Sequence, residues 1–514
     1  MTDECLRNCF HDTFVRQGNK TAITLLKRGQ KETEISYLEL DQDAGRVANA
    51  FLEMGVKKGD RVVFFFDKSL FFVVAHLAVQ KLGAVSVPLN PGFKKSEMAY
   101  LLGDVKAALV LSGPAQNSLI KDIDPGLKTM VMDPQCPYQD LDFFRHQPSE
   151  ISSPVGITSE DPGLIIYTSG TTGKPKGAVL TQRNLLHDAR NVAHVWDITS
   201  PDVLCHALPL FHVHGLCFAL HTSLMVGAHV VMLDAFSPET VISVLQDKQR
   251  LVCTVFMAVP SMYARLLDGL GDKILDFEHI RLWTSGSAPL LVKDFERIKR
   301  AFGKEPVERE GMSETGMNFS NPLRGRKKPG SIGLPLPGLE VRIVHPVTFQ
   351  DVKAGETGEI WLKGPAVTPG YWQKPEETAK TFVNGWFRTG DLGRVDDEGY
   401  YYLTDRLKHI IISGGENISP KEVESVINRL EGVAESSVIG LPDDQWGEKV
   451  AAAVVPRPQS KVTPEDIREF CKDHLHNWKC PKEVLLVKTL PRNTMGKVLK
   501  EELKNLFADK ASHS

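Results

Sequence analysis

Hydrophobic and polar positions follow two rhythms along most of the chain, that of helices and that of short strands. The segment 38–54 has apolar residues at helical spacing, Gly59-Asp60 follows as a turn, and 61–65 is a β-branched and aromatic run that predicts a strand. The same order of helix and strand recurs over 96–111 and over 239–256. The pattern predicts an α/β fold built from layered helices and sheets.

The pattern changes from about Gly330, where alternating runs are punctuated by Gly and Pro. Such runs are typical of hairpins and predict a small antiparallel sheet or barrel. After residue 407 the mixed α/β pattern returns for about a hundred residues, a common size for a separate domain. We therefore expect a large domain over 1–405 and a small α+β domain over 406–514, with the boundary near Asp405–Lys408.

The most apolar stretch, Leu70–Leu89, is interrupted by His76, Gln80, Lys81 and Gly83. It is too short and too polar for a membrane span and predicts a buried helix followed by a strand. The N-terminus has no basic stretch followed by an apolar run, so no signal peptide is expected.

Composition narrows the class of protein. The 514 residues are 42% hydrophobic and 24% charged, as in globular proteins, and are too many for one ordinary core. A formal net charge of −3 gives no general attraction to nucleic acid or an anionic membrane. Eight cysteines without a CxxC pair argue against a disulfide scaffold or structural zinc. We expect a cytoplasmic protein, monomeric or homodimeric, whose partners are small molecules.

The sharpest local feature is the segment Tyr167–Gly177, which follows the apolar run Leu164–Ile166. Its glycines allow backbone N–H groups to approach an anion, and its hydroxyls and lysines add donors and charge. It is not a Walker A loop, because Pro175 follows Lys174 where that motif requires Ser or Thr. A polar hairpin turn is the alternative. The predicted polyphosphate-binding residues are Thr168, Ser169, Gly170, Thr171, Thr172, Gly173, Lys174 and Lys176.

This loop resembles the nucleotide loop of the adenylate-forming superfamily of acyl-CoA synthetases, luciferases and adenylation domains. Further motifs follow in the family's order, and together they cover the chain from about residue 38 to 497. The resemblance implies a large N-terminal domain with a β-barrel-like part, a small mobile C-terminal domain, and the use of ATP, Mg²⁺ and coenzyme A. Because only a short tail follows residue 497, coenzyme A is favoured over a fused carrier domain as the acceptor.

The segment 310–316 resembles the family's adenine-closing motif, in which Glu314 and Thr172 would serve the Mg²⁺ ion. Glu310 stands where the family usually has an aromatic residue that stacks on adenine. A hydrogen bond or a looser adenine site would replace that stacking. Residues 285–289 resemble the backbone strip along the adenine edge. The implied adenine-side residues are Ser287, Ala288, Pro289, Glu310, Gly311, Met312 and Ser313.

Three later motifs complete the resemblance. Asp391, in the segment 386–391, would hold the ribose hydroxyls, since a carboxylate accepts both protons. Arg406 would reach the ribose or a phosphate, and Lys408 would be the hinge. Lys497 matches the family's catalytic lysine and would bridge the attacking carboxylate and the α-phosphate. The pantetheine channel would be lined by Gly414, Gly415 and Glu416.

The acid-binding segments resemble the malonyl-CoA synthetase branch of the superfamily, at 211–216, 308–309, 316–318 and 321–326. A second carboxylate requires a buried cation, for which Arg309 is the first candidate and Arg324 the second. Val213 and Met317 would line the side of the pocket that faces a methyl on the α-carbon. His212 would lie beside the substrate at the mouth of the thiol channel.

Several alternatives remain open at this point. Arg309 could pair with Glu308 or Glu310, and the loop around Arg324 could be solvated or could contact phosphates of coenzyme A. His214 is expected to be a packed histidine. The enzyme could instead activate a fatty or aryl acid in an apolar pocket, or the chain could be a regulatory nucleotide-binding protein without activity.

Overall fold

The computed structural model describes residues 4–133, 136–151, 156–168, 174–271, 273, 275–414, 416–493 and 496–511. The chain divides into two compact units. Unit 1 comprises Met1–Glu340 and Leu362–Phe387, and unit 2 comprises Val341–Trp361 and Arg388–Ser514. Compactness does not locate a pivot, so the domain boundary near Asp405–Lys408 stays a prediction.

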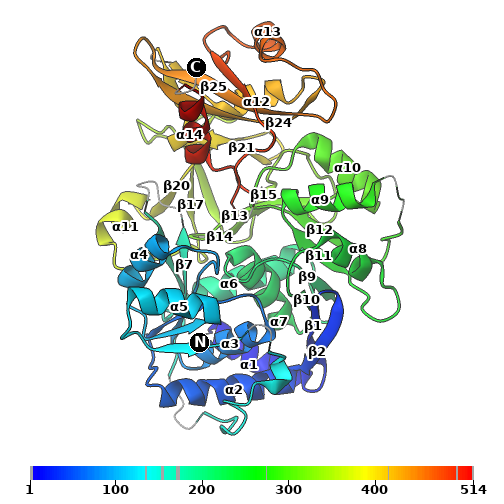
Figure 1. The fold of residues 1–514 in the computed structure, drawn as a ribbon, viewed down its shortest axis with the longest axis vertical. Coiled ribbons are helices and arrows are strands. Elements are labelled where there is room, and N and C mark those ends of the chain that lie inside the picture. The colour runs from blue at the N-terminus through cyan, green and yellow to red at the C-terminus, as the bar shows by residue number, and fades with distance from the viewer. Residues whose placement is uncertain are drawn as a thin grey trace. The chain divides into compact units, whose positions relative to one another are not determined.

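Unit 1 contains a seven-stranded sheet in the order β18-β8-β7-β4-β3-β5-β6 (Figure 1). Strands β7, β4, β3, β5 and the edge strand β6 are parallel, and β8 is antiparallel to β7. The strands are β3 (Arg61–Phe65), β4 (Val85–Pro88), β5 (Leu109–Ser112), β6 (Thr129–Val131), β7 (Pro162–Thr168), β8 (Lys176–Thr181) and β18 (Gly370–Tyr371). The accompanying helices are α2 (Tyr37–Glu53), α3 (Leu70–Lys81), α4 (Lys95–Val105) and α5 (Pro114–Ile123).

The apolar pattern of these elements explains their packing. Residues Leu70–Gln80 of α3 are all buried, as expected of a helix that is apolar on every side. The prediction of a buried helix followed by a strand is therefore confirmed. Met98, Leu101 and Ile120 of α4 and α5 pack in one cluster with the strand residues Val63 and Val85. A capping box formed by Ser36 and Glu39 begins α2.

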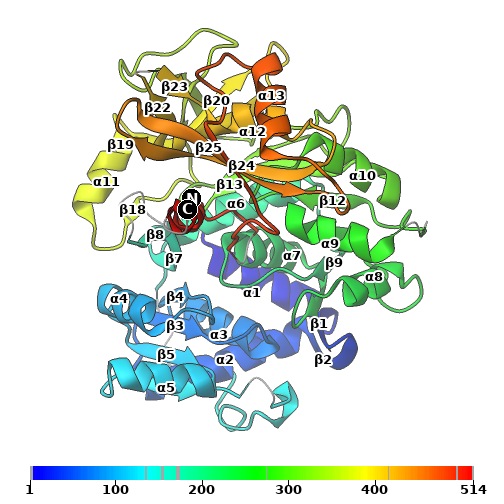
Figure 2. The ribbon, with the colours of Figure 1, turned by 45° about the horizontal axis from the view of Figure 1, so that its top comes forward.

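A nine-stranded sheet, in the order β15-β14-β13-β12-β11-β9-β10-β1-β2, carries much of the candidate site. Helices α8, α9 and α10 lie side by side along it (Figures 1 and 2). The strands are β1 (Thr21–Lys27), β2 (Gln30–Ser36), β9 (Val203–His206), β10 (His229–Leu233), β11 (Val255–Ala258), β12 (Leu282–Ser285), β13 (Val307–Met312), β14 (Gly316–Ser320) and β15 (Leu334–Pro335). The remaining helical elements before residue 303 are α1 (Leu6–Gln17), η1 (Tyr138–Asp140), α6 (Gln182–Val195), the π-helix η2 (His214–His221), α7 (Thr222–Val226), α8 (Pro238–Gln246), α9 (Pro260–Leu270) and α10 (Val292–Phe302).

The segment punctuated by Gly and Pro forms a small sheet in the order β16-β17-β20, with β21 antiparallel to β20. These strands are β16 (Glu340–Val344), β17 (Gly358–Lys363), β20 (Trp386–Val395) and β21 (Tyr401–Arg406). The helix α11 (Pro375–Thr381) precedes the short strand β19 (Phe382–Val383), which pairs with the first residues of β20.

The last part of unit 2 is a five-stranded sheet with helices on both faces. Successive side chains of β25 point to opposite faces of the sheet. One hydrophobic cluster, with α12 and α13, contains Val450, Ala452 and Val454, and the other, with α14, contains Ala451 and Ala453. Its elements are η3 (Leu407–His409), β22 (Ile411–Ser413), β23 (Glu416–Ile418), α12 (Pro420–Ile427), β24 (Val433–Asp443), β25 (Gly447–Pro456), α13 (Pro464–His474), β26 (Glu483–Leu486) and α14 (Lys500–Ala511). The predicted mixed α/β texture after residue 407 is confirmed.

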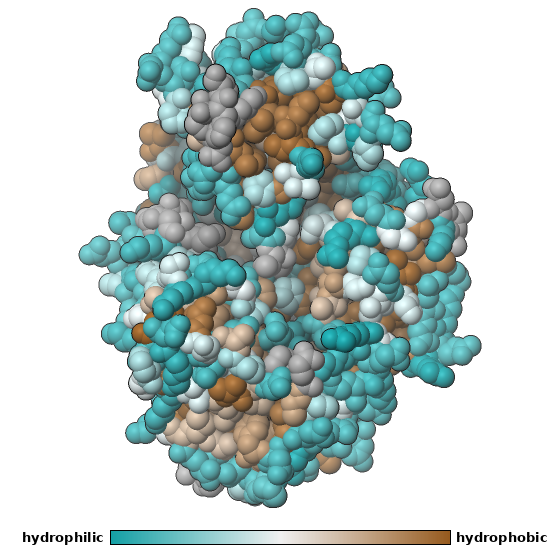
Figure 3. All heavy atoms as spheres, in the orientation of Figure 1, coloured by the Kyte–Doolittle hydropathy of each residue, from teal (hydrophilic) through white to brown (hydrophobic). Residues whose placement is uncertain are grey.

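The surface agrees with the composition. Hydrophilic residues cover most of the face drawn in Figure 3, and a hydrophobic patch lies over β24 and β25. Across the described residues no helix has the length and apolar character needed to cross a membrane. All eight cysteines lie within the described residues and are free thiols.

Candidate active site

The predicted phosphate loop connects the adjacent strands β7 and β8, and the structure describes the residues at the two ends of this loop. Thr168 ends β7 and Lys176 begins β8, and the two residues are register partners. Lys176 is buried and forms an ion pair with Glu377 of α11. Lys174 lies with its ammonium nitrogen 5.5 Å from the centre of the Tyr100 ring. Between these strand ends, Ser169, Gly170, Thr171, Thr172 and Gly173 lie outside the described residues.

Glu314 lies at the turn of the hairpin formed by β13 and β14, and its side chain is buried. Its Oε1 accepts hydrogen bonds from the Thr168 hydroxyl at 3.2 Å and the Tyr371 hydroxyl at 3.1 Å. The backbone of Gly316, with φ of 71°, closes the turn in the left-handed region that favours glycine. The hairpin thus brings the predicted Mg²⁺ ligand to the end of the phosphate loop.

Arg309 of β13 is a buried cation, with 3% of its surface exposed. Its guanidinium carbon lies 5.0 Å from the centre of the Phe218 ring. A Cβ on Gly286 would lie 2.5 Å from Arg309 Nε, so the residue at 286 must lack a side chain for the arginine to fit. Burial lowers the pKa of Arg309 to about 10, which leaves the guanidinium charged at neutral pH.

The two glutamates next to Arg309 in sequence have partners of their own. Glu308 accepts the backbone N–H groups of Leu290 at 3.4 Å and Gly330 at 3.2 Å. Glu310 accepts a hydrogen bond from the Asn318 amide at 3.0 Å. Arg309 Nε and Nη2 are buried and have no hydrogen-bond partner among the described residues. The arginine is therefore a charged donor oriented for an external acceptor.

Asp188 of α6 is a buried carboxyl group near Arg309. Its Oδ1 accepts the backbone N–H of Met317 at 2.8 Å, and a Cβ on Gly316 would lie 2.6 Å from the same oxygen. Burial raises the pKa of Asp188 to about 7, although the Met317 N–H and the Arg309 charge both act in the opposite direction. Asp188 is thus close to half ionised at neutral pH.

Two histidines lie on the segment that precedes and begins η2. His212 has its pKa lowered to about 4 by burial, and burial with the nearby Arg309 charge lowers that of His214. The Nε2 atoms of both are buried without a partner among the described residues. The Ser287 hydroxyl lies 3.3 Å from His214 Nδ1. Ser287 has φ of 69°, an uncommon backbone conformation for a residue with a side chain.

Asp391 and Arg406 face each other in unit 2 as register partners of β20 and β21. Arg406 Nε lies 2.7 Å from Asp391 Oδ1, and its Nη2 donates to Oδ2 at 3.4 Å. The turn before Asp391 is fixed by the buried Glu359, which pairs with Arg388 at 2.8 Å and accepts the Gly390 N–H. The carboxylate is held in place while lone pairs remain for other donors.

Lys497 lies in unit 2 among cations. Burial and the charges of Arg406 and Lys408 lower its pKa to about 8, although Asp391 acts in the opposite direction. Its backbone N–H donates to Asn493 Oδ1 at 2.9 Å. An ammonium group in this position is stabilised when an anion binds.

The segment around the predicted hinge is tied to α12. Asp405 is buried, and its Oδ2 accepts the Ser419 hydroxyl at 2.6 Å and the Lys421 N–H at 3.0 Å. Lys408 follows in the short helix η3 and is exposed. Gly414 and Glu416 lie at the exposed turn between β22 and β23, and Gly415 lies outside the described residues.

Comparison with known proteins places this geometry in a family. A family model described as AMP-binding enzyme matches residues 10–372, and one described as AMP-binding enzyme C-terminal domain matches residues 422–497. The chain belongs to the AMP-binding enzyme family. It is an AMP-forming acyl-CoA synthetase of the adenylate-forming superfamily, as the motifs predicted.

Relatives of this AMP-binding enzyme have several acid specificities. Mouse mitochondrial malonate–CoA ligase ACSF3 is 36% identical over 87% of this chain and 82% of the relative. Feruloyl-CoA synthase of an Amycolatopsis species is 34% identical over 97% of this chain and 96% of the relative. The ATP-bound crystal structure of MatB from Rhodopseudomonas palustris is 36% identical, covers 98% of this chain and 99% of its own, and has a TM-score of 0.91.

The structure brings most of the predicted acid-site residues of this AMP-binding enzyme together in unit 1. Met317 is buried in β14, whereas Val213 and His212 are partly buried beside η2. Arg324 is elsewhere, because its side chain is 85% exposed and pairs at 2.8 Å with the exposed Asp197. Arg309 is therefore the better of the two arginine candidates. The backbone strip Ser287–Pro289 follows β12, and Gly311–Ser313 end β13 and begin its turn.

Several residues that shape the site were not predicted. Asp188, Tyr371 and Glu377 are distant in sequence from the groups they contact, as Lys176 and Glu377 are 201 positions apart. The Pro375-Glu376-Glu377 run did signal a helix start with acidic residues, but nothing in it identified Lys176 as the partner.

Proposed function

We propose that this acyl-CoA synthetase activates malonate or methylmalonate with ATP and transfers the acyl group to coenzyme A. The observation that carries the proposal is Arg309, a buried and charged guanidinium with two nitrogens that lack partners among the described residues. Burying an unpaired cation is costly, and a carboxylate ligand offsets that cost by bidentate hydrogen bonding. The names of the malonate–CoA ligase relatives support the same substrate class.

The pocket also supports the size of the acid. Phe218 and the guanidinium of Arg309 are in contact, so the second carboxylate would lie close to an aromatic ring and leave little room for a long chain. Val213 and Met317 would line the side where the methyl of methylmalonate lies. His212 would lie beside the reacting carboxylate, at the mouth of the thiol channel.

Adenylate formation joins two anions, so it requires charge neutralisation and in-line positioning. Lys174 and Lys176 would hold the β- and γ-phosphates, with Lys176 exchanging its Glu377 contact for a phosphate. Mg²⁺ prefers a few carboxylate and hydroxyl oxygens together with substrate phosphates, which Glu314 and Thr172 would supply. The phosphate site would be completed by the Thr168 hydroxyl and by three further residues of the same loop, Gly170, Thr171 and Gly173.

The nucleoside and the thiol would use other groups. Asp391 would accept the ribose hydroxyls, with Arg406 holding the carboxylate in place. Lys497 would bridge the attacking carboxylate and the α-phosphate. After adenylation, rotation about Lys408 would withdraw Lys497 and bring Gly414, Gly415 and Glu416 to the pantetheine arm, a gating step between the half-reactions.

Pyrophosphate release with ATP and Mg²⁺ tests the proposal across malonate, methylmalonate, acetate, a medium-chain fatty acid and a benzoate. We expect malonate or methylmalonate to give the highest kcat/KM. A higher value with acetate or the fatty acid contradicts the dicarboxylate assignment, and no release with any acid contradicts an active ligase.

Arg309→Met should lower kcat/KM for malonate about 10²-fold or more, because it removes one partner of a buried charge pair. The KM for ATP should stay within about twofold, since the guanidinium is assigned to the acid. Arg324→Met is the matched control, and this exposed arginine should leave the malonate kinetics unchanged. The opposite ranking of the two variants contradicts the assignment.

A further inference from the structure

Lys68 is a partly buried lysine that the proposed reaction does not use, and burial lowers its pKa to about 7. It follows β3 and precedes Ser69, the residue that caps the N-terminus of α3. Its ammonium nitrogen lies 2.8 Å from His206 Nδ1 and 2.8 Å from the His206 carbonyl oxygen. Lysine is rarely removed from water without an ion-pair partner, so an amino group that contacts an imidazole and a carbonyl requires an explanation.

The contacts of His206 determine its tautomer. Its Nε2 lies 2.9 Å from the carbonyl oxygen of Gly215, which can only accept a hydrogen bond. Nε2 must therefore carry the proton, and Nδ1 must be the acceptor. The amino group of Lys68 supplies an N–H donor to Nδ1 and stabilises this tautomer. Burial and the Lys68 charge lower the pKa of His206 to about 3, so the imidazole is neutral.

Gly215 is the point where this arrangement reaches the acid site. It is the second residue of the π-helix η2, and π-helical turns are common at functional sites. A Cβ on Gly215 would lie 2.1 Å from the carbonyl oxygen of Pro209, so the chain closes tightly on itself here. The N–H of Leu216 donates to the His212 carbonyl at 3.0 Å. His206 thus contacts the segment 212–215 at the Gly215 carbonyl, and the same segment contains His212 and His214.

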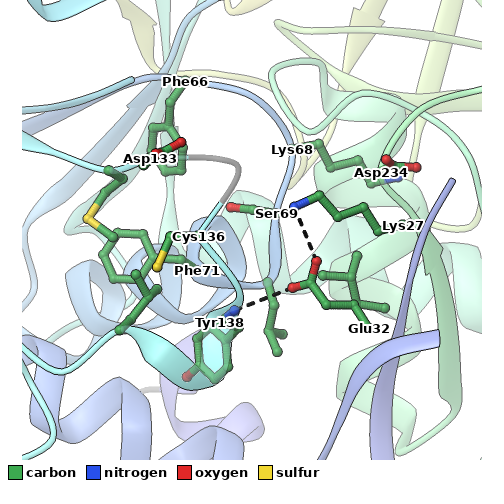
Figure 4. A pocket seen from close by; sticks show the side chains of 14 residues that line it. Lys27, Glu32, Phe66, Lys68, Ser69, Phe71, Asp133, Cys136, Tyr138 and Asp234 are labelled. Carbon is green, nitrogen blue, oxygen red and sulfur yellow. Dashed lines mark hydrogen bonds and ion pairs between the residues drawn. The ribbon is translucent and has the colours of Figure 1, made fainter. Parts of the chain in front are cut away.

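The cavity beside Lys68 supplies a natural control. Lys68 and Lys27 both line it, together with Glu32, Tyr138 and Asp234 (Figure 4). Lys27 pairs with Glu32 at 3.5 Å, and Glu32 accepts the backbone N–H of Tyr138. One lysine of the cavity therefore has a carboxylate partner, whereas the other contacts the histidine that leads to Gly215.

We propose that Lys68 is a positioning residue for the acid site, which acts through His206 to fix the Gly215 carbonyl and the segment 212–215. The proposal rests on the proposed function only in treating His212 and Val213 as part of the acid site. It does not depend on which acid is the substrate.

The tautomer is tested first, in the wild-type enzyme, by nitrogen-15 NMR of the imidazole rings with His206→Gln to assign the signal. We expect a neutral His206 with its proton on Nε2. A proton on Nδ1, or a protonated ring at neutral pH, would overturn the proposal. This measurement requires no active substrate, so it stays informative if malonate is not the acid.

The kinetic test uses Lys68→Met, which keeps the unbranched chain as far as Cε and removes the donor. With the acid that the wild type uses best, we expect the KM for the acid to rise about tenfold and the KM for ATP to stay within about twofold, since small displacements of positioning groups have effects of this size or larger. Lys68→Gln retains an N–H donor and should recover part of the loss. Lys27→Met should behave as the wild type.

A double-mutant cycle separates positioning from a general loss of packing. In a His206→Phe background, Lys68→Met should raise the acid KM by no further factor, because the route through His206 is already absent. Additive effects, or equal rises in the KM values for acid and ATP, would overturn the proposal. If Lys68→Met does not fold, two other measurements test the proposal. One is the same double-mutant cycle with Lys68→Gln, and the other is the His206 tautomer in the wild-type enzyme.

Discussion

Arg309 in unit 1 is buried and Lys497 in unit 2 is partly buried, and the charges around these two cations suit them to different roles. Burial lowers the pKa of Arg309 to about 10, and the nearby carboxyls of Asp188 and Glu310 favour its charge. The pKa of Lys497 falls to about 8 because neighbouring Arg406 and Lys408 oppose its charge as burial does. The arginine is a permanent charge, suited to recognition. The lysine has a pKa close to neutral pH, and bound anions stabilise its charged form. This suits a group that acts only in the adenylation step.

This contrast predicts its largest effect for Lys497→Ala. Removing the cation that neutralises the reacting anions should lower the adenylation rate about 10²–10³-fold. Thioester formation from supplied acyl adenylate should be largely intact, because that half-reaction has no attacking carboxylate. Rapid-quench measurement of each half-reaction checks the prediction. Lys504→Ala, an exposed lysine of α14 paired with Glu501, is the control. Equal loss of both half-reactions contradicts the role.

A smaller effect is expected from pH. Bound anions raise the pKa of Lys497 toward its ordinary value. In the free enzyme the pKa is about 8, so the ammonium group loses its proton above pH 8. The kcat/KM for adenylation should therefore fall about five- to tenfold from pH 8 to pH 9. Thioester formation from supplied adenylate should lack this limb. A limb of equal size in both half-reactions would assign the titration to another group.

The smallest effect concerns the carboxyl beside Arg309. Asp188 has its pKa raised to about 7, so the protonated form prevails below pH 7 and the carboxylate prevails above it. The anion partly offsets the Arg309 charge, and the KM for malonate should rise a few-fold between about pH 6 and pH 8. Asp188→Asn keeps an acceptor for the Met317 N–H and should flatten this dependence. Asp197→Asn, an exposed carboxyl, is the control, and an unchanged pH profile in Asp188→Asn contradicts the prediction.

Local pattern was sufficient for much of the fold. The buried helix and strand over 70–89 and the hairpins after residue 330 follow from composition at successive positions, which the structure reproduces. Glu314, Asp391 and Arg406 could be predicted as a set because each lies within a short motif. Their roles in catalysis stay predictions.

What the sequence did not reveal is the pairing between distant segments. Asp188 meets the backbone of Met317 across 129 positions, and Lys68 meets His206 across 138. Such contacts arise from the order in which strands join the sheets, and no spacing in the sequence encodes them. Arg324 shows the reverse case, since its neighbourhood in sequence suggested the acid site while its side chain is exposed beside Asp197.

The central claim is that Arg309 holds a second carboxylate of the substrate. A crystal structure of the enzyme with malonyl adenylate tests it most directly. We predict the free carboxylate on the Arg309 guanidinium, with charge-assisted hydrogen bonds of about 2.7–2.9 Å to Nε and Nη2. A carboxylate bound elsewhere, with Arg309 still without an acceptor, would contradict the account.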